Sequence, residues 1–146
     1  MKLKIITVGK LKEDYLKKGI EFYKKGISKK LQLELIEVPD EKAPENMSQK
    51  EEEKIKEIEG KKILSHIKEN TYVVALAIEG KAIDMKSYLE KKKNDQLPEV
   101  AFIIGGSLGL SKEVLTRSDY KISFSKMTFP HQLMKLILME QLEKSI

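Results

Sequence analysis

The run from Val73 to Ile78 is apolar at every position (VVALAI). A strand of this composition has no polar face to turn toward water, so it lies inside a sheet that is covered on both faces. A second apolar stretch, Val100 to Ile104, is also typical of a strand, and Gly105 and Gly106 end it. These two runs favour a parallel sheet between layers of helices.

Strand and helix patterns alternate along the rest of the chain. Ser48 followed by Glu51 is a capping box, which marks a helix start, and a shift in apolar phase at Gly60 predicts a bend. Strands are predicted at 3–8, 33–38, 73–78, 100–104 and roughly 121–125, and helices over 16–27, 48–68, 85–93 and 132–142, with a short one capped by Ser111. The fold class is therefore α/β, with a mainly parallel sheet and flanking helices, and residues 1–146 are expected to form a single domain.

Composition excludes several kinds of site. The chain has no cysteine, which rules out disulfides and thiolate metal sites. His66 and His131 are the only histidines, too few for a metal site built from imidazoles, and no metal is expected. No stretch approaches the length of a transmembrane span, and the lysine-rich start lacks the apolar core of a signal peptide. We therefore expect a cytoplasmic protein without a membrane partner, in which His66 has a surface or structural role.

Positive charge is unevenly distributed. The net charge is +5, and residues 1–31 hold ten lysines against three acidic residues. A second cluster lies at 91–93. Such clusters suit a polyanion such as nucleic acid, although solvated faces of lysine-rich helices give the same pattern.

The segment from Ala101 to His131 holds the predicted ligand site. A buried strand runs into a glycine turn (GGSLG), and a second strand and a loop follow within about twenty residues. Parallel sheets present backbone to ligands at such turns, because glycine lets the ligand approach closely. The pattern is neither GxGxxG nor a P-loop, so the common phosphate-binding fingerprints do not apply.

A small serine hydrolase is an alternative interpretation of the same turn. Gly105 to Gly109 match GxSxG around Ser107, and Asp119 and His131 follow in the order Ser–Asp–His. The three residues span only the segment 107–131, however, and the chain is much shorter than hydrolases of that type.

The last predicted helix is apolar around most of its circumference. Pro130 is suited to its first position, where a missing N–H costs nothing. The apolar residues that follow are Leu133, Met134, Leu136, Ile137, Leu138, Met139 and Leu142. One core-facing stripe needs fewer, so we expect a subunit interface on this helix. A central helix buried within one subunit is the alternative.

Several segments resemble the RlmH family of SPOUT methyltransferases. They are VGKLKEDY, VPDEKAPENMS, LAIEGK, FIIGGSLGL and SFSKMTFPHQLMKLILMEQL, in the order of the family's landmarks and over nearly the whole chain. The resemblance implies an enzyme that uses S-adenosyl-L-methionine (AdoMet) to methylate ring nitrogen N3 of a pseudouridine in 23S ribosomal RNA of the large ribosomal subunit. It also implies a homodimer and a C-terminal trefoil knot, which no periodicity could indicate. A non-catalytic RNA-binding module is the remaining alternative.

The resemblance also implies which residues contact the cofactor. They are Leu76, Gly105, Phe124, Ser125, Lys126, Met127, Thr128 and Phe129. Leu76 offers an apolar surface to adenine, Gly105 admits the cofactor close to the backbone, and the loop supplies backbone N–H and C=O groups. Without the resemblance, Leu76 and Phe124 would be interpreted as core residues.

Two further roles are expected within that framework. His131 is the only titratable group of the central segment with a suitable ordinary pKa, which makes it the candidate catalytic base for the N3 proton. Lys10, Lys12 and Lys126 are candidate contacts to RNA phosphates.

The end of the chain departs from the family pattern. Glu140, Gln141 and Leu142 match, but Glu143 to Ile146 stand where the family continues with Tyr–Arg–Ala and a tail carrying a Tyr–His pair. We therefore expect the chain to bind AdoMet but to methylate ribosomes poorly, because cofactor affinity and RNA orientation depend on different contacts.

Overall fold

A computed structural model describes residues 1–42, 45–125, 127 and 129–146. Its sheet has five strands: β1 (Lys2–Val8), β2 (Gln32–Val38), β3 (Tyr72–Lys81), β4 (Glu99–Ile104) and β5 (Tyr120–Ile122). The strands lie in the order β2-β1-β4-β3-β5, and every neighbouring pair is parallel. The predicted α/β class and parallel sheet are confirmed, whereas the knot stays a prediction.

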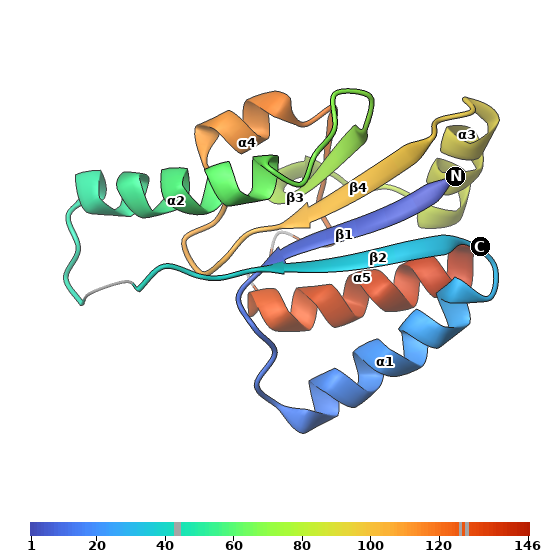
Figure 1. Cartoon of the computed structure of the whole chain (residues 1–146), viewed down its shortest axis with the longest axis horizontal. Helices are drawn as coiled ribbons and strands as arrows, with labels where there is room; N and C mark the ends of the chain where they lie inside the picture. Colours follow the sequence, from blue (N-terminus) through green and yellow to red (C-terminus); the bar gives the residue numbers. More distant parts are fainter. Residues whose placement is uncertain (43–44, 126, 128) are drawn as a thin grey trace.

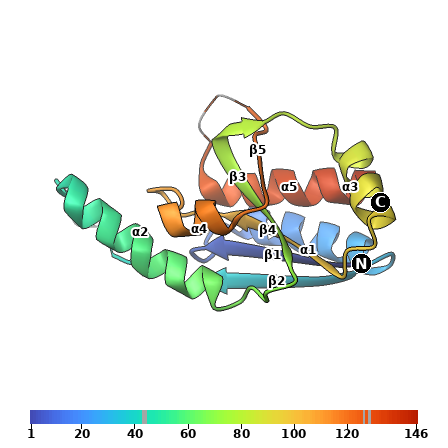
Figure 2. The same ribbon diagram turned by 90° about the horizontal axis from the view of Figure 1, so that it is seen from above.

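Helices cover both faces of the sheet. They are α1 (Asp14–Ser28), α2 (Gln49–Leu64), α3 (Met85–Asn94), α4 (Lys112–Arg117) and α5 (His131–Ser145). Figure 1 shows α2 and α4 on one face and α1 and α5 on the other, with α3 at the end of α5. In Figure 2 the first turns of α2 project beyond the carboxyl ends of the strands.

Successive side chains of the central strands enter two separate cores. Leu3 and Ile5 of β1 pack in the core under α1, α3 and α5, whereas Ile6 and Val8 pack in the core under α2 and α4. All six residues of β4 are buried. Burial on both faces explains why β4 is apolar without alternation from Val100 to Ile104.

Three local predictions are refined by the structure. Helix α2 ends at Leu64 rather than near residue 68, and it is continuous through Gly60. A side chain at Gly60 would overlap Ser111 Oγ, so this glycine allows close packing of α2 on α4. Pro130 is the residue before α5, not its first helical residue, and its carbonyl accepts a hydrogen bond from the Met134 amide at 3.1 Å. The predicted caps are confirmed, since the Ser48 and Ser111 hydroxyls each accept an amide hydrogen bond.

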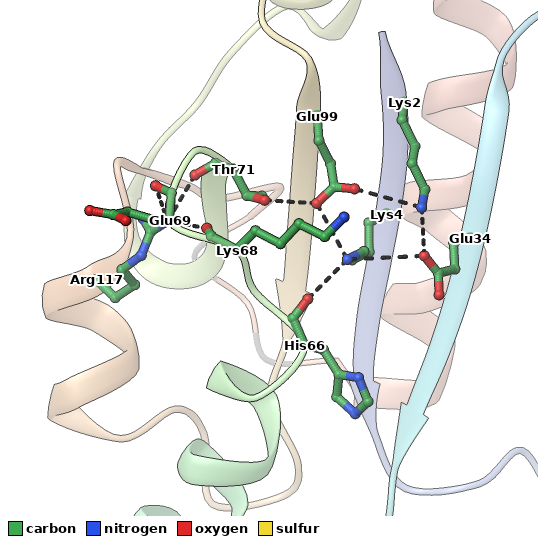
Figure 3. A network of polar contacts seen from close by, with 9 residues as sticks. All are labelled: Lys2, Lys4, Glu34, His66, Lys68, Glu69, Thr71, Glu99 and Arg117. Atoms are coloured by element: carbon green, nitrogen blue, oxygen red, sulfur yellow. Dashed lines mark hydrogen bonds and ion pairs between the residues drawn. The ribbon is translucent and has the colours of Figure 1, made fainter.

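A polar network holds the amino ends of the strands together (Figure 3). The buried Lys4 ammonium lies 3.3 Å from Glu99 Oε1 and donates to the His66 carbonyl at 2.9 Å. Thr71 donates its hydroxyl to the same Glu99 oxygen at 2.7 Å, and Arg117 donates to the Thr71 carbonyl at 2.9 Å. His66 thus contributes through its backbone, and its side chain is exposed.

The electrostatics of Glu99 follow from this network. Burial acts to raise the pKa of the Glu99 carboxyl, but the hydrogen bond from Thr71 and the charges of Lys4 and Lys2 outweigh it. The net pKa of Glu99 is lowered, so this carboxylate is stabilised in its charged form.

Helix α5 is partly a core helix. Leu138, Met139 and Leu142 are fully buried within the chain. Leu133, Leu136 and Ile137 are only half-buried. The alternative of a central helix therefore accounts for one side of α5 and leaves a partly exposed apolar side.

Within the described residues, no helix is long and apolar enough to cross a membrane.

Candidate ligand-binding cleft

A cleft of about 830 Å³ opens at the carboxyl ends of β3, β4 and β5. Its walls come from the end of β3, the turn after β4, the loop between β5 and α5, and the first turn of α5. Open α/β sheets bind ligands at this edge, because the loops that follow the strands converge there. Its size lies within the usual range for small-molecule sites.

The glycine turn after β4 forms the floor of the cleft. The Gly109 amide donates to the Gly106 carbonyl at 3.0 Å, and Gly109 has a φ of 87°, which favours glycine. A Cβ at Gly105 would lie 2.8 Å from the carbonyl carbon of Gly109. The turn itself therefore requires Gly105, in addition to the close ligand approach that the sequence predicts.

A bulge in β3 forms the outer wall. Leu76 and Lys81 both lie opposite Ile122 of β5, so the residues between them leave the ladder. Gly80 permits this, because a Cβ there would lie 2.6 Å from the Ile122 carbonyl carbon. The bulge turns Ile78 and Glu79 toward the cleft, where both line it.

Every predicted cofactor residue that the structure describes lines this cleft. They are Leu76, Gly105, Phe124, Ser125, Met127 and Phe129. Lys126 and Thr128 lie outside the described residues. Leu76 and Phe124 also touch the core under α1 and α5, so they combine a packing role with an apolar cleft wall.

His131 links the cleft to the end of β1. Its side chain lines the cleft, and its Nε2 lies 3.4 Å from the position of a Cβ on Gly9. Gln132 donates its side-chain amide to the Lys10 carbonyl at 2.8 Å. The predicted base and the predicted RNA contact Lys10 are therefore neighbours, and Lys10 and Lys12 are both exposed.

The serine hydrolase interpretation fails on geometry. Ser107 and His131 both line the cleft, but Asp119 precedes β5 at the opposite end of the sheet. There the Asp119 carboxylate accepts the Val73 amide at 2.7 Å and lies 3.3 Å from Arg117. A catalytic aspartate must orient the histidine, which Asp119 cannot do from that position.

A buried carboxylate lies between the glycine turn and the loop after β2. Glu59 of α2 accepts the Glu41 amide at 3.0 Å, and its Oε1 lies 3.5 Å from the position of a Cβ on Gly106. Burial raises the pKa of Glu59, which the hydrogen bond from Glu41 opposes and the negative charges of Asp40 and Glu41 reinforce. Glu59 thus fastens the loop after β2 to α2 at a cost in desolvation, and its carboxylate lies close to the glycine turn.

Sequence reasoning missed two charged residues of the cleft, Lys56 and Glu79. Lys56 lies in the middle of α2 and reaches the cleft only because α2 runs past the strand ends (Figure 2). Its position among other charged residues of a helix gave no signal. Glu79 precedes Gly80, and a glycine inside a strand pattern is a known sign of a bulge that could have identified it.

Comparisons with known proteins agree with this architecture. The family model described as predicted SPOUT methyltransferase matches residues 1–145. Ribosomal RNA large subunit methyltransferase H of Clostridioides difficile (strain 630) is 56% identical, over 99% of this chain and 93% of the relative. The proteins of the same name from Alkaliphilus oremlandii (strain OhILAs) and Clostridium botulinum (strain Okra / Type B1) are each 52% identical, covering 94% and 93% of those relatives. A match over nearly the full length, together with a parallel sheet and a cleft at its carboxyl edge, shows that the chain belongs to the SPOUT methyltransferase family.

Proposed function

We propose that the protein transfers a methyl group from AdoMet to ring nitrogen N3 of a pseudouridine in 23S ribosomal RNA. The observation that carries this proposal is a single cleft in which the described residues expected to contact AdoMet come together, in a chain 56% identical to a named ribosomal RNA methyltransferase. The whole chain, 1–146, acts as one methyltransferase domain on ribosomes in the cytoplasm.

The cleft suits the cofactor in size and chemistry. Leu76, Phe124 and Phe129 supply apolar surfaces for an adenine ring, and the glycine turn leaves backbone groups open to the sugar. AdoMet brings an activated methyl group on a sulfonium, so the protein has to orient it and exclude water. The described part of the chain has no group of three or more potential metal-ligating side chains.

His131 is the proposed acceptor of the N3 proton. That proton has to leave the ring before or during methyl transfer, and an imidazole at the wall of the cleft can take it. Exposed Lys10 lies near His131, because its carbonyl accepts the side-chain amide of Gln132, and exposed Lys12 follows two residues later. With Lys126, these lysines bind the phosphates that flank the target nucleotide.

The experiment is methyl transfer from tritiated AdoMet to ribosomes of cells that lack the protein, followed by mapping of the labelled nucleotide. Label on a pseudouridine of 23S RNA is expected. A His131→Ala variant should transfer about a hundredfold more slowly at unchanged cofactor affinity, the usual loss for a general base. Binding of RNA without any transfer would favour the RNA-binding module instead, and labelling of Ser107 by a fluorophosphonate would favour the hydrolase.

We also propose that the protein is a homodimer through α1 and α5. Tyr15 and Phe22 of α1 are 69% and 71% exposed, which is unusual for aromatic residues. Gly19 and Gly26 lie on the same side of α1 and pack on α5, where Leu136 and Ile137 are half-buried. An apolar surface of this kind suits a second copy of the chain.

Sedimentation tests the dimer directly. The parent protein is expected to sediment as a dimer at micromolar concentration, and Phe22→Lys as a monomer. Lys17→Glu, about 140° away around α1, is the matched control and should leave the dimer intact. A monomeric parent protein contradicts this part of the proposal.

A further inference from the structure

Among the described residues that line the cleft, the side chains with a permanent charge at neutral pH are Lys56 and Glu79. They come from different walls, Lys56 from α2 and Glu79 from the bulge of β3. The rest of the lining is apolar, hydroxyl or backbone, apart from His131. A described lining that holds one cationic and one anionic side chain is matched to a ligand that itself carries both signs of charge.

Glu79 is available for such a ligand. It is exposed, and it forms no ion pair with another residue in the described part of the chain. Its place in the cleft depends on the bulge, which the chain maintains by placing Gly80 against the Ile122 backbone. In a regular strand, residues 77–80 would continue along the ladder, so the bulge redirects this carboxylate toward the ligand.

Lys56 is also available, although less freely. Its side chain is 23% exposed, and its ammonium lies 3.6 Å from the carboxylate of Glu53, which is 52% exposed. A pair this open to solvent contributes little energy, so Glu53 does not compete strongly with a ligand carboxylate. Three quarters of the Lys56 side chain is covered, which limits the conformational entropy lost on binding.

We infer that Lys56 and Glu79 recognise the amino-acid part of the methyl donor, a deepening that rests on the proposed function. Lys56 pairs with the carboxylate of the methionine moiety. Glu79 attracts the positive charges of its ammonium and sulfonium groups. The spent product, S-adenosylhomocysteine, has lost the sulfonium charge, so Glu79 favours the charged donor over the neutral thioether and promotes product exchange.

Three ligands that differ in charge distinguish the contributions of Lys56 and Glu79. AdoMet carries a carboxylate and two positive groups, S-adenosylhomocysteine a carboxylate and one positive group, and 5′-methylthioadenosine none of them. Calorimetry should show that Glu79→Gln lowers the affinity for AdoMet by about fivefold. The affinity for S-adenosylhomocysteine should fall by less, and the affinity for methylthioadenosine should not change. Lys56→Met, which keeps the length of the side chain, should lower the affinities for AdoMet and S-adenosylhomocysteine equally. It should leave the affinity for methylthioadenosine unchanged. Glu53→Gln is the control and should leave the affinities for all three ligands unchanged.

The outcomes distinguish the possible failures. Unchanged AdoMet affinity in both variants, or equal weakening of all three ligands, overturns the inference. Loss of RNA affinity without loss of AdoMet affinity in Lys56→Met overturns it as well and assigns this lysine to the RNA. A parent protein that binds none of the three ligands overturns the proposed function together with the inference, whereas normal parent binding with unaffected variants overturns the inference alone.

Discussion

At the amino ends of the strands, side chains are tied to one another by ion pairs and hydrogen bonds, whereas at the carboxyl ends the chain turns on glycines around an open cleft. The first region is formed by Lys4, Glu99, Thr71 and Arg117, which hydrogen bonds and an ion pair link into one network (Figure 3). Gly105, Gly106 and Gly109 shape the second. The same sheet therefore places its rigid polar contacts far from the ligand site.

This contrast separates stability from function in a testable way. Changes at the amino ends should alter the free energy of unfolding and leave ligand affinity unchanged. Changes at the carboxyl ends should alter ligand affinity, whatever their effect on the free energy of unfolding. We test this contrast with four predictions, in decreasing order of expected size.

The largest expected effect is at Glu99. Glu99→Ala leaves the buried Lys4 ammonium with the His66 carbonyl and the more distant Glu34 carboxylate at 4.0 Å, and it removes the acceptor of Thr71. Breaking a buried ion pair from one side costs about 3 kcal/mol of unfolding free energy. Urea denaturation measures it, and calorimetry should give unchanged AdoMet affinity in the folded variant. Glu99→Gln keeps an acceptor for Thr71 and should lose less unfolding free energy than Glu99→Ala. Equal losses by the two variants would contradict this role of the Thr71 hydrogen bond.

The next effect is at the glycine turn. Gly105→Ala places a Cβ 2.8 Å from the Gly109 backbone, which cannot move aside as a flexible side chain would. We expect a loss of about 1–2 kcal/mol in stability, as for overpacking, and a loss of AdoMet affinity of at least about tenfold. In Gly106→Ala the closest contact is a Val8 side chain at 3.2 Å, so its losses should be smaller. An unaffected affinity in folded Gly105→Ala would separate this turn from the ligand.

A single hydrogen bond at the amino ends gives a smaller effect. Thr71→Val replaces the hydroxyl that donates to Glu99 by a methyl group of the same shape. The carboxylate keeps Lys4 as a partner, so the expected loss is about 1 kcal/mol. Thermal and urea denaturation should agree on it. A loss as large as that of Glu99→Ala would mean that the ion pair itself contributes little.

The smallest effects concern pH, and the two ends should differ in sign. The folded pKa of Glu99 is lowered, so its contribution is present above its ordinary pKa of 4.5 and is lost as the pH falls through the folded value. Burial raises the folded pKa of Glu59, so its contribution is full below 4.5 and is lost as the pH rises through the folded value. Between pH 7 and pH 3, the stability of the parent protein relative to Glu99→Gln should therefore fall as the pH falls. Its stability relative to Glu59→Gln should rise over the same range. Parallel curves would contradict both assignments.

Sequence patterns predicted the sheet and helices well, because burial on both faces leaves a strong apolar signal in β1, β3 and β4. The shorter β5 begins one residue earlier and ends three residues earlier than expected, since an edge strand of three residues carries little periodicity. The sequence predicts a bend of α2 at Gly60, whereas this glycine is needed because Ser111, the N-cap of α4, packs against it.

The candidate site was only partly predictable for the same reason. Leu76, Gly105 and the loop after β5 came from motif resemblance, and the structure brings their described members to one cleft. Lys56 reaches it from a helix that starts far away in sequence, and Glu79 reaches it through a bulge. Local patterns cannot report such encounters, since they depend on how distant segments meet.

The position of β1 has a consequence for how the protein is made. Of the five strands of the sheet, β1 is synthesised before the others, yet it lies between β2 and β4, and residues 2–7 pair with residues 99–104. During synthesis β1 can pair early with β2, but its other edge stays open until β4 has emerged. An unpaired edge of an apolar strand is a site of wrong association between chains. We therefore expect nascent chains that stop before residue 99 to aggregate or to require a chaperone, because the core closes only when the last third of the protein arrives.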